Sequence, residues 1–169
     1  MSQPVAEHRA ASPQVITCAI VTISDTRTLD TDAGGQTAVD LLTAAGHIIA
    51  ERAILRDEPR SIRETLHRIA AAGKIDAVLL TGGTGISSRD QTFETVCELL
   101  TKQLPGYGEL FRMLSYQEIG PAAILSRAVG GLMGRLVVLT MPGSPAGVRL
   151  AIEKIILPEL GHLVREARR

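Results

Sequence analysis

A glycine-rich segment after an aliphatic run is the part of this sequence best suited to bind a charged ligand. The run Val78–Leu80 leads into the segment Thr81–Gly85, which reads TGGTG, and Asp90 follows five residues later. Glycine lets the backbone adopt positive φ and approach a ligand, and successive N–H groups in such a turn form a concave nest for phosphate. The sequence therefore predicts an anion site at this segment.

The segment does not match the two familiar nucleotide-binding motifs. A Walker A loop requires a lysine after its last glycine, and Ile86 follows Gly85 here. A dinucleotide fingerprint requires a third glycine, and Ser88 occupies that position. A nicotinamide-dependent dehydrogenase is therefore disfavoured.

Acidic or small polar residues follow three other predicted strands. Ser24 and Asp25 follow the first strand, Asp57 follows the second, and Pro142–Ser144 form a turn between the last strand and a helix. Together with Asp90 they have the chemistry that holds Mg²⁺ and a polyphosphate. Each also has a purely structural interpretation. Ser24 and Asp25 could satisfy their own turn, Asp57 and Asp90 could cap helices, and the last turn could be a plain connection.

The elements that would position these residues alternate along the chain. The sequence predicts strands at residues 15–24, 47–55, 76–81 and 135–141, of which the first and the last are buried and the first is central. Helical spacing of apolar residues predicts helices at 37–46, 60–73, 92–100 and 109–119, and loops, short helices or a hairpin fit the rest of 105–134. A closing helix, kinked or interrupted by Pro158, is expected along one edge of the sheet. This order predicts an α/β fold with a mostly parallel sheet covered on both faces, and a ligand beyond the carboxyl ends of the strands.

Length and composition limit the classes of function. The 169 residues fit one domain over residues 15–169, preceded by a flexible tail at residues 1–14 that lacks the apolar core of a signal peptide. Eighteen basic and eighteen acidic residues give no net charge, which argues against nucleic acid, and no apolar run is long enough to span a membrane. The two cysteines show no metal or disulfide spacing, and the four histidines are scattered, which fits a cytoplasmic protein without zinc.

With these motifs in order, the chain resembles the molybdenum cofactor biosynthesis B and Mog family over most of Val15–Leu163. The resemblance rests on seven segments rather than on TGGTG alone. They are Ser24–Asp25, Asp57–Pro59, Thr81–Gly85 with Arg89–Asp90, Pro105–Glu109, Phe111–Arg112, Leu125–Ala128 and Met141–Ser144.

The resemblance implies a three-layer α/β/α sandwich that assembles into trimers or hexamers. It also implies that molybdopterin and Mg-ATP react to give adenylylated molybdopterin and pyrophosphate. Asp57 and Asp90 match the family's two catalytic acids, which would hold Mg²⁺. The residues that would line the nucleotide and pterin site are Ser24, Asp25, Thr81, Gly82, Gly83, Thr84, Gly85, Pro142, Gly143 and Ser144.

The resemblance also implies a partner that receives the product and a second possible function for the chain. Product could pass to the molybdenum-insertion protein that acts on the same cofactor. Some members of the B branch lack the acids and are catalytically silent, so a molybdopterin-binding oligomer without turnover is the second interpretation. Glu109, Arg112, Ser126 and Arg127 match positions near the site, and the sequence assigns no role to them.

Overall fold

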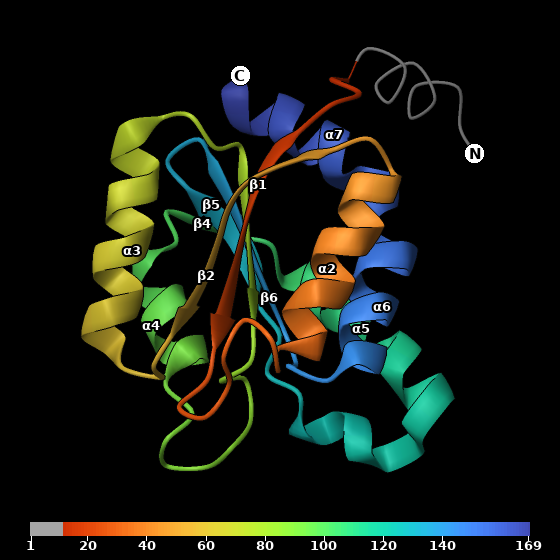
Figure 1. Cartoon of the computed structure of the whole chain (residues 1–169). Helices are drawn as coiled ribbons and strands as arrows, with labels where there is room; N and C mark the ends of the chain where they lie inside the picture. Colours follow the sequence, from red (N-terminus) through yellow and green to blue (C-terminus); the bar gives the residue numbers. More distant parts are fainter. Residues whose placement is uncertain (1–11) are drawn as a thin grey trace.

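Strands and helices alternate along the computed structural model of the chain, which describes residues 12–169 (Figure 1). The strands are β1 (Thr17–Ile23), β2 (Ile48–Leu55), β3 (Ala77–Thr81), β4 (Lys102–Gln103), β5 (Gly130–Met133) and β6 (Leu136–Met141). The α-helices are α2 (Ala33–Ala44), α3 (Pro59–Ala72), α4 (Thr92–Leu99), α5 (Pro105–Ile119), α6 (Pro145–Ala151) and α7 (Leu157–Arg168). A 3₁₀ helix, η1 (Gly120–Leu125), follows α5, and a π-helical segment, η2 (Ile152–Ile156), joins α6 to α7.

Within the described residues the strands form one mixed sheet in the order β2-β1-β3-β6-β5-β4. The pairs β2–β1, β1–β3 and β3–β6 are parallel, whereas β6–β5 and β5–β4 are antiparallel. The predicted α/β class with a mostly parallel sheet is confirmed. The first strand lies inside the sheet as predicted, but β3 and β6 occupy its centre.

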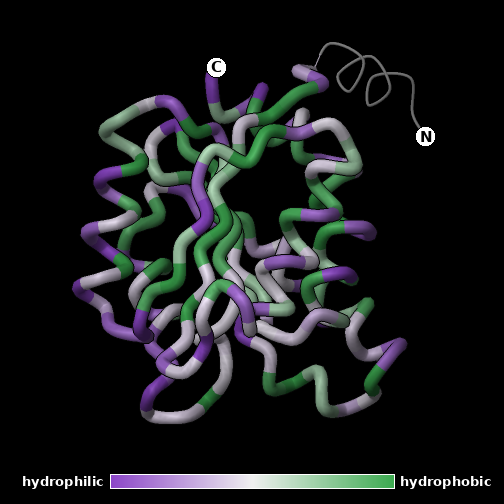
Figure 2. Tube along the Cα trace, in the orientation of Figure 1, coloured by the Kyte–Doolittle hydropathy of each residue, from purple (hydrophilic) through white to green (hydrophobic). Residues whose placement is uncertain are grey.

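Helices cover both faces of the sheet and form the three layers of a sandwich. Successive residues of β1 point to opposite faces, so Cys18 and Ile20 belong to one buried cluster and Ala19 and Val21 to the other. Figure 1 shows α2, α5, α6 and α7 on one side of the sheet and α3 and α4 on the other. Hydrophobic residues run along the strands between these layers (Figure 2). The strands β1, β3 and β6 are therefore buried on both faces, whereas β2 at the edge of the sheet is only partly buried.

The closing helix packs on a face of the sheet, and its predicted place along an edge is wrong. Val148, Ile152 and Ile156 share a buried cluster with Leu79 of β3 and Leu139 of β6. The predicted interruption near Pro158 is found: η2 replaces the regular α-helical spacing just before it. A proline lacks the N–H that an α-helical turn needs, and a π turn accommodates that loss without ending the helix.

Two helices begin four residues earlier than predicted. Helix α2 starts at Ala33 because Asp32 caps it, and α5 starts at Pro105 because a proline fits the first turn of a helix. The remainder of 105–134 forms η1 and the antiparallel strands β4 and β5. None of the described helices is both long and apolar enough to span a membrane.

The predicted tail falls mostly on residues 1–11, which lie outside the described residues. Ser12 is buried, and the carbonyl oxygen of Pro13 lies so close to Gly161 of α7 that a Cβ there would be 2.6 Å from it. Ser12 and Pro13, assigned to the tail from the sequence, therefore pack against α7. Cys18 is also fully buried, and burial raises the pKa of its thiol to about 12.

Candidate functional site

The predicted site residues converge at one edge of the sheet. Strands β2, β1, β3 and β6 are parallel neighbours, so their carboxyl ends meet there, at the bottom of Figure 1. Hydrogen bonds join the turns that follow them. The Ser24 amide donates to Leu55 O at 2.8 Å, the Gly82 amide donates to Met141 O at 2.9 Å, and Thr81 Oγ1 donates to Pro142 O at 3.4 Å.

Gly82 and Gly83 have no room for a side chain. Both have positive φ, 99° and 64°. A Cβ on Gly82 would lie 2.3 Å from Ile23 O, and one on Gly83 would lie 2.0 Å from Thr92 Oγ1 and 2.5 Å from Asp57 Oδ2. The two glycines therefore allow the TGGTG segment to lie directly against the end of β1 and against Asp57.

Asp57 is buried and ties the end of β2 to the start of α4. Its Oδ1 accepts hydrogen bonds from the Gln91 amide at 3.1 Å and from Thr92 Oγ1 at 3.3 Å. Only 7% of the residue is exposed, and this burial raises the pKa of the carboxyl. The negative charges of Asp90 and Asp25 nearby raise the pKa further. The alternative that Asp57 caps the helix beginning near Arg60 is wrong, because Glu58 occupies that cap and Asp57 binds α4.

Asp90 closes the loop between Gly85 and α4. Its Oδ2 accepts from the Ser87 amide at 2.8 Å, and a Cβ on Gly85 would lie 2.8 Å from the same oxygen. Gln91, not Asp90, is the N-cap of α4, so the capping alternative is wrong for Asp90 as well. Its carboxylate instead organises the loop that carries it.

Asp25 and Ser24 have different surroundings. Asp25 Oδ2 accepts from Arg89 Nη2 at 2.7 Å, and this hydrogen bond lowers the pKa of the carboxyl. The pair joins the loop after β1 to the loop after TGGTG. Ser24 Oγ accepts from the amides of Thr26 and Arg27 at 3.2 and 3.1 Å, as the structural interpretation predicted. Ser24 still lines a cavity described below.

The donor set at this edge fits a hard cation that also binds phosphate. Both hydrogen bonds described for the Asp57 carboxylate fall on Oδ1, and the one described for Asp90 falls on Oδ2. The neighbouring groups are oxygen donors, which Mg²⁺ prefers. Residues 12–169 contain no group of three or more acidic, histidine or cysteine side chains that could hold a metal. The described side chains therefore do not form an all-protein cage for a metal ion.

Replacing Asp57 by asparagine is expected to stabilise the fold at neutral pH. A carboxyl whose pKa is higher in the folded than in the unfolded state loses stability as pH rises from the unfolded value, about 3.9, through the folded one. Asparagine keeps the Oδ1 acceptor without the charge. Thermal unfolding should therefore give Asp57→Asn a higher melting temperature than wild type at pH 8, with the gap closing below pH ~4. A gap independent of pH would contradict this.

Sequence reasoning missed a second buried acid at the same edge. Asp32 Oδ1 accepts from the Gly35 amide at 2.9 Å, and Oδ2 accepts from Thr22 Oγ1 at 2.7 Å and from Arg52 Nη2 at 3.3 Å. A Cβ on Gly34 would lie 2.5 Å from Gly143 O, so α2 begins directly against the last turn. The available signal was an Asp three residues before a Gly, which is a helix-capping pattern.

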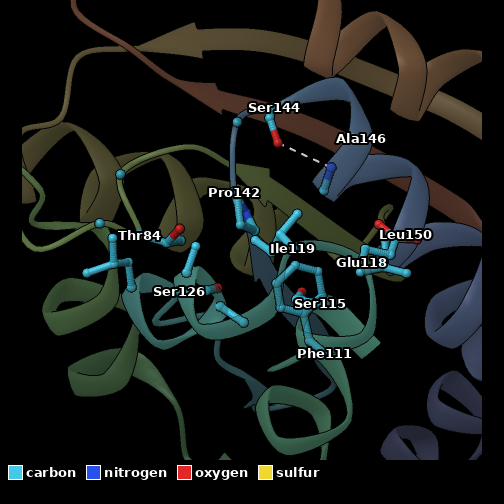
Figure 3. A pocket seen from close by; sticks show the side chains of 17 residues that line it. Thr84, Phe111, Ser115, Glu118, Ile119, Ser126, Pro142, Ser144, Ala146 and Leu150 are labelled. Carbon is cyan, nitrogen blue, oxygen red and sulfur yellow. Dashed lines mark hydrogen bonds between the residues drawn. The ribbon is translucent and has the colours of Figure 1, made fainter. Parts of the chain in front are cut away.

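Two cavities lie on either side of the turn Pro142–Ser144. The first, of about 340 Å³, is mostly apolar and is bounded by Phe111, Ile119, Leu150 and the TGGTG segment (Figure 3). The second, of about 400 Å³, is lined by both polar and apolar residues, and its polar residues include Ser24, Arg27, Asp32 and Thr81. Gly143 and Ser144 line both cavities. Asp57 and Asp90 are absent from the described linings and lie directly behind Gly83 and Gly85.

Comparisons with known proteins agree with this geometry. A family model described as a probable molybdopterin binding domain matches residues 19–162. Molybdenum cofactor biosynthesis protein B of Halalkalibacterium halodurans is 50% identical over 163 residues, which cover 96% of each chain. The protein of the same name from Bacillus subtilis is 48% identical over 170 residues, which cover 98% of each chain.

Solved structures give the same result. A crystal structure of molybdenum cofactor biosynthesis protein B is 51% identical, with a TM-score of 0.90 over 94% of this chain and 99% of that chain. The tungsten cofactor synthesizing protein MoaB from Pyrococcus furiosus is 32% identical, with a TM-score of 0.83 over 94% and 100%. This chain therefore belongs to the molybdenum cofactor biosynthesis protein B family of molybdopterin-binding domains.

Proposed function

We propose that this protein transfers the adenylyl group of Mg-ATP to molybdopterin during molybdenum cofactor biosynthesis. The observation that carries the proposal is that Asp57 and Asp90, the two acids the reaction needs, lie behind Gly83 and Gly85 of one glycine-rich anion site. A family member kept only for binding would not need either acid. The names of the related proteins support the cofactor pathway and leave the reaction itself to be tested.

The two cavities suit two ligands that meet at one turn. The apolar cavity beside Phe111 and Ile119 suits a flat ring system, and the second cavity, where Arg27 and Thr81 supply polar groups, suits phosphate or sugar groups. Gly143 and Ser144 border both, so phosphates entering from the two sides would meet there. The open backbone of the TGGTG segment supplies further donors at that point.

In the proposed reaction the terminal phosphate oxygen of molybdopterin attacks the α-phosphorus of ATP. A phosphoanhydride bond forms between the two phosphates as the bond from the α-phosphorus to the oxygen bridging to the β-phosphate breaks, and pyrophosphate leaves with that electron pair. Mg²⁺, when bound, neutralises the phosphates and the departing pyrophosphate. Asp57 and Asp90 would hold it, the TGGTG segment would orient the phosphates, and no protein nucleophile is needed.

Pyrophosphate release from Mg-ATP, measured with and without molybdopterin, tests the proposal. Release that depends on the pterin supports the adenylyltransferase. Tight molybdopterin binding without release would instead favour the second interpretation, a catalytically silent molybdopterin-binding oligomer. A cytoplasmic location and handover of the product to a molybdenum-insertion protein complete the proposal.

We further propose that the protein is a homo-oligomer, a trimer or a hexamer, which associates through an apolar face on α5 and η1. Exposed large apolar side chains gather there, and such patches mark interaction sites. They are Leu110, Met113, Tyr116, Ile119, Ile124 and Leu125. The face adjoins the apolar cavity, because Ile119 and Leu125 belong to both.

A charge on this face is expected to dissociate the oligomer. Met113→Glu would place a carboxylate in the interface, and desolvating an unpaired charge there is costly. Light scattering should show a fall in mass toward one chain. Leu29→Glu is the matched control, since Leu29 is 53% exposed and Met113 is 52% exposed, and Leu29 lies outside this face. An unchanged mass for Met113→Glu would place the interface elsewhere.

A further inference from the structure

Arg127 projects from a backbone segment that is fixed to the centre of the sheet. Thr140 of β6 holds Val129, since its Oγ1 accepts from the Val129 amide at 2.9 Å and donates to the Val129 carbonyl at 3.1 Å. The buried Tyr107 hydroxyl donates to the Thr140 carbonyl at 3.0 Å. Because these bonds are buried, the segment that carries Arg127 has little freedom to shift.

From this fixed segment, Arg127 connects both loops of the proposed site. Its amide donates to the carbonyl of Thr84 at 3.1 Å, and its Nη2 donates to the carbonyl of Asp90 at 3.0 Å. Its Nη1 pairs with Glu94, and its guanidinium lies over the Phe93 ring, 5.1 Å from the centroid. Arg127 therefore links the TGGTG segment, the Asp90 loop and α4.

The hydrogen bonds of the Arg127 guanidinium are directed at the Asp90 loop and at α4. Nε of Arg127 is buried and has no hydrogen-bond partner among residues 12–169, although buried donors are normally paired. The guanidinium leaves that donor unpaired while Nη2 reaches the Asp90 carbonyl. An arginine suits this task because its planar fork directs Nη1 and Nη2 to two acceptors at fixed angles, which the single ammonium of lysine cannot do.

We infer that Arg127 is a positioning residue, which acts through Asp90 and Thr84 to hold the acid and the anion nest at the spacing required for transfer. The expected effect on turnover rests on the proposed function. The expected effect on the position of the loops rests on the contacts of Arg127 alone. Because Arg127 is not placed on either substrate, its loss is expected to slow the chemical step more than it weakens ATP binding.

The kinetic test uses Arg127→Gln, Arg127→Lys and a matched control. Arg63 of α3 also pairs with a carboxylate of α4, Glu98, away from both loops, so Arg63→Gln removes a similar contact without touching the site. Both Arg127 variants are expected to lower kcat for pyrophosphate release by about 10²-fold, the effect of a shift of roughly 1 Å, with KM for ATP near the wild-type value. Arg63→Gln should match wild type. A loss of activity that appears as a higher KM for ATP, or a wild-type kcat in Arg127→Lys, would overturn the inference.

Hydrogen exchange tests the same inference without turnover. The Ser87 amide is held by Asp90 and the Gln91 amide by Asp57, so both report on the loop. They should exchange faster in Arg127→Gln and Arg127→Lys than in Arg63→Gln, while amides of β1 keep their protection. Unchanged exchange at Ser87 and Gln91 would overturn the role of Arg127. A wild-type protein that releases no pyrophosphate would contradict the proposed function, and the exchange comparison would still decide the positioning role.

Discussion

Asp57→Asn and Asp90→Asn are each expected to lower pterin-dependent pyrophosphate release by at least about 10³-fold, because each variant removes a carboxylate that would hold Mg²⁺ against the triphosphate, a contribution of several kcal/mol. The fold should survive both changes. Asparagine keeps an acceptor for the Gln91 amide at position 57 and for the Ser87 amide at position 90. Steady-state release, with molybdopterin binding measured beside it, checks the effect.

Asp76→Asn is the matched control for these two variants. Asp76 also anchors a strand, through the Thr17 amide at 3.0 Å, and pairs with Arg168, but it lies just before β3 at the opposite edge of the sheet. It should keep full activity. Wild-type turnover in Asp57→Asn or Asp90→Asn would rule out the assigned role of that acid. If Asp57→Asn loses activity and also melts at a higher temperature than wild type, the charge of Asp57 lowers stability while it supports activity.

Gly83→Ala is the second change with a large expected effect, on both activity and stability. The new Cβ would sit 2.0 Å from Thr92 Oγ1 and 2.5 Å from Asp57 Oδ2, so the loop or the acid must move. Overpacking of this kind costs about 1–3 kcal/mol, in addition to about 1–2 kcal/mol for a left-handed alanine. Pyrophosphate release should fall by about 10²-fold or more, as expected for a displacement near 1 Å. Chemical denaturation and the release assay measure the two effects.

Gly134→Ala separates the backbone strain from the clash. Gly134 has a φ of 62°, against 64° for Gly83, and a Cβ there would meet no described atom within 4 Å. Gly134→Ala should therefore lose only the stability that an alanine with left-handed backbone costs, and it should keep full activity. Equal losses of stability in the two variants would mean that the contact with Asp57 and Thr92 is not tight, and that the glycine serves only its own turn.

Local sequence patterns predicted the parallel strands and most of the helices, because the apolar pattern of a strand or helix is set by residues close together in the sequence. The apolar runs of β1, β3 and β6 are buried on both faces, and such runs identify buried strands. The start of α2 could not be placed from helical propensity, since Gly34 and Gly35 disfavour helix and only the Asp32 cap fixes it. The start of α5 at Pro105 was missed because a turn-like Pro-Gly sequence opens that helix.

The candidate site was predicted as a set of strand ends, but the partners of its residues were not. Asp57 accepts a hydrogen bond from Thr92, the first residue of a helix that begins 35 residues later, and no local pattern indicates a partner at that distance. The same holds for Arg127, whose contacts with Thr84 and Asp90 depend on how β5 and β6 bring distant segments together. Residue types therefore indicated the chemistry, and only the fold indicates which side chains hold one another in place.

Transfer of label from [α-³²P]ATP to molybdopterin in a single turnover tests the central claim most directly, because it follows the bond that the proposed reaction forms. The account predicts that the label appears in the pterin product together with one equivalent of unlabelled pyrophosphate, and that Asp57→Asn and Asp90→Asn give neither. Molybdopterin that remains unlabelled on wild-type protein, with both ligands bound, would contradict the adenylyltransferase and leave a binding protein.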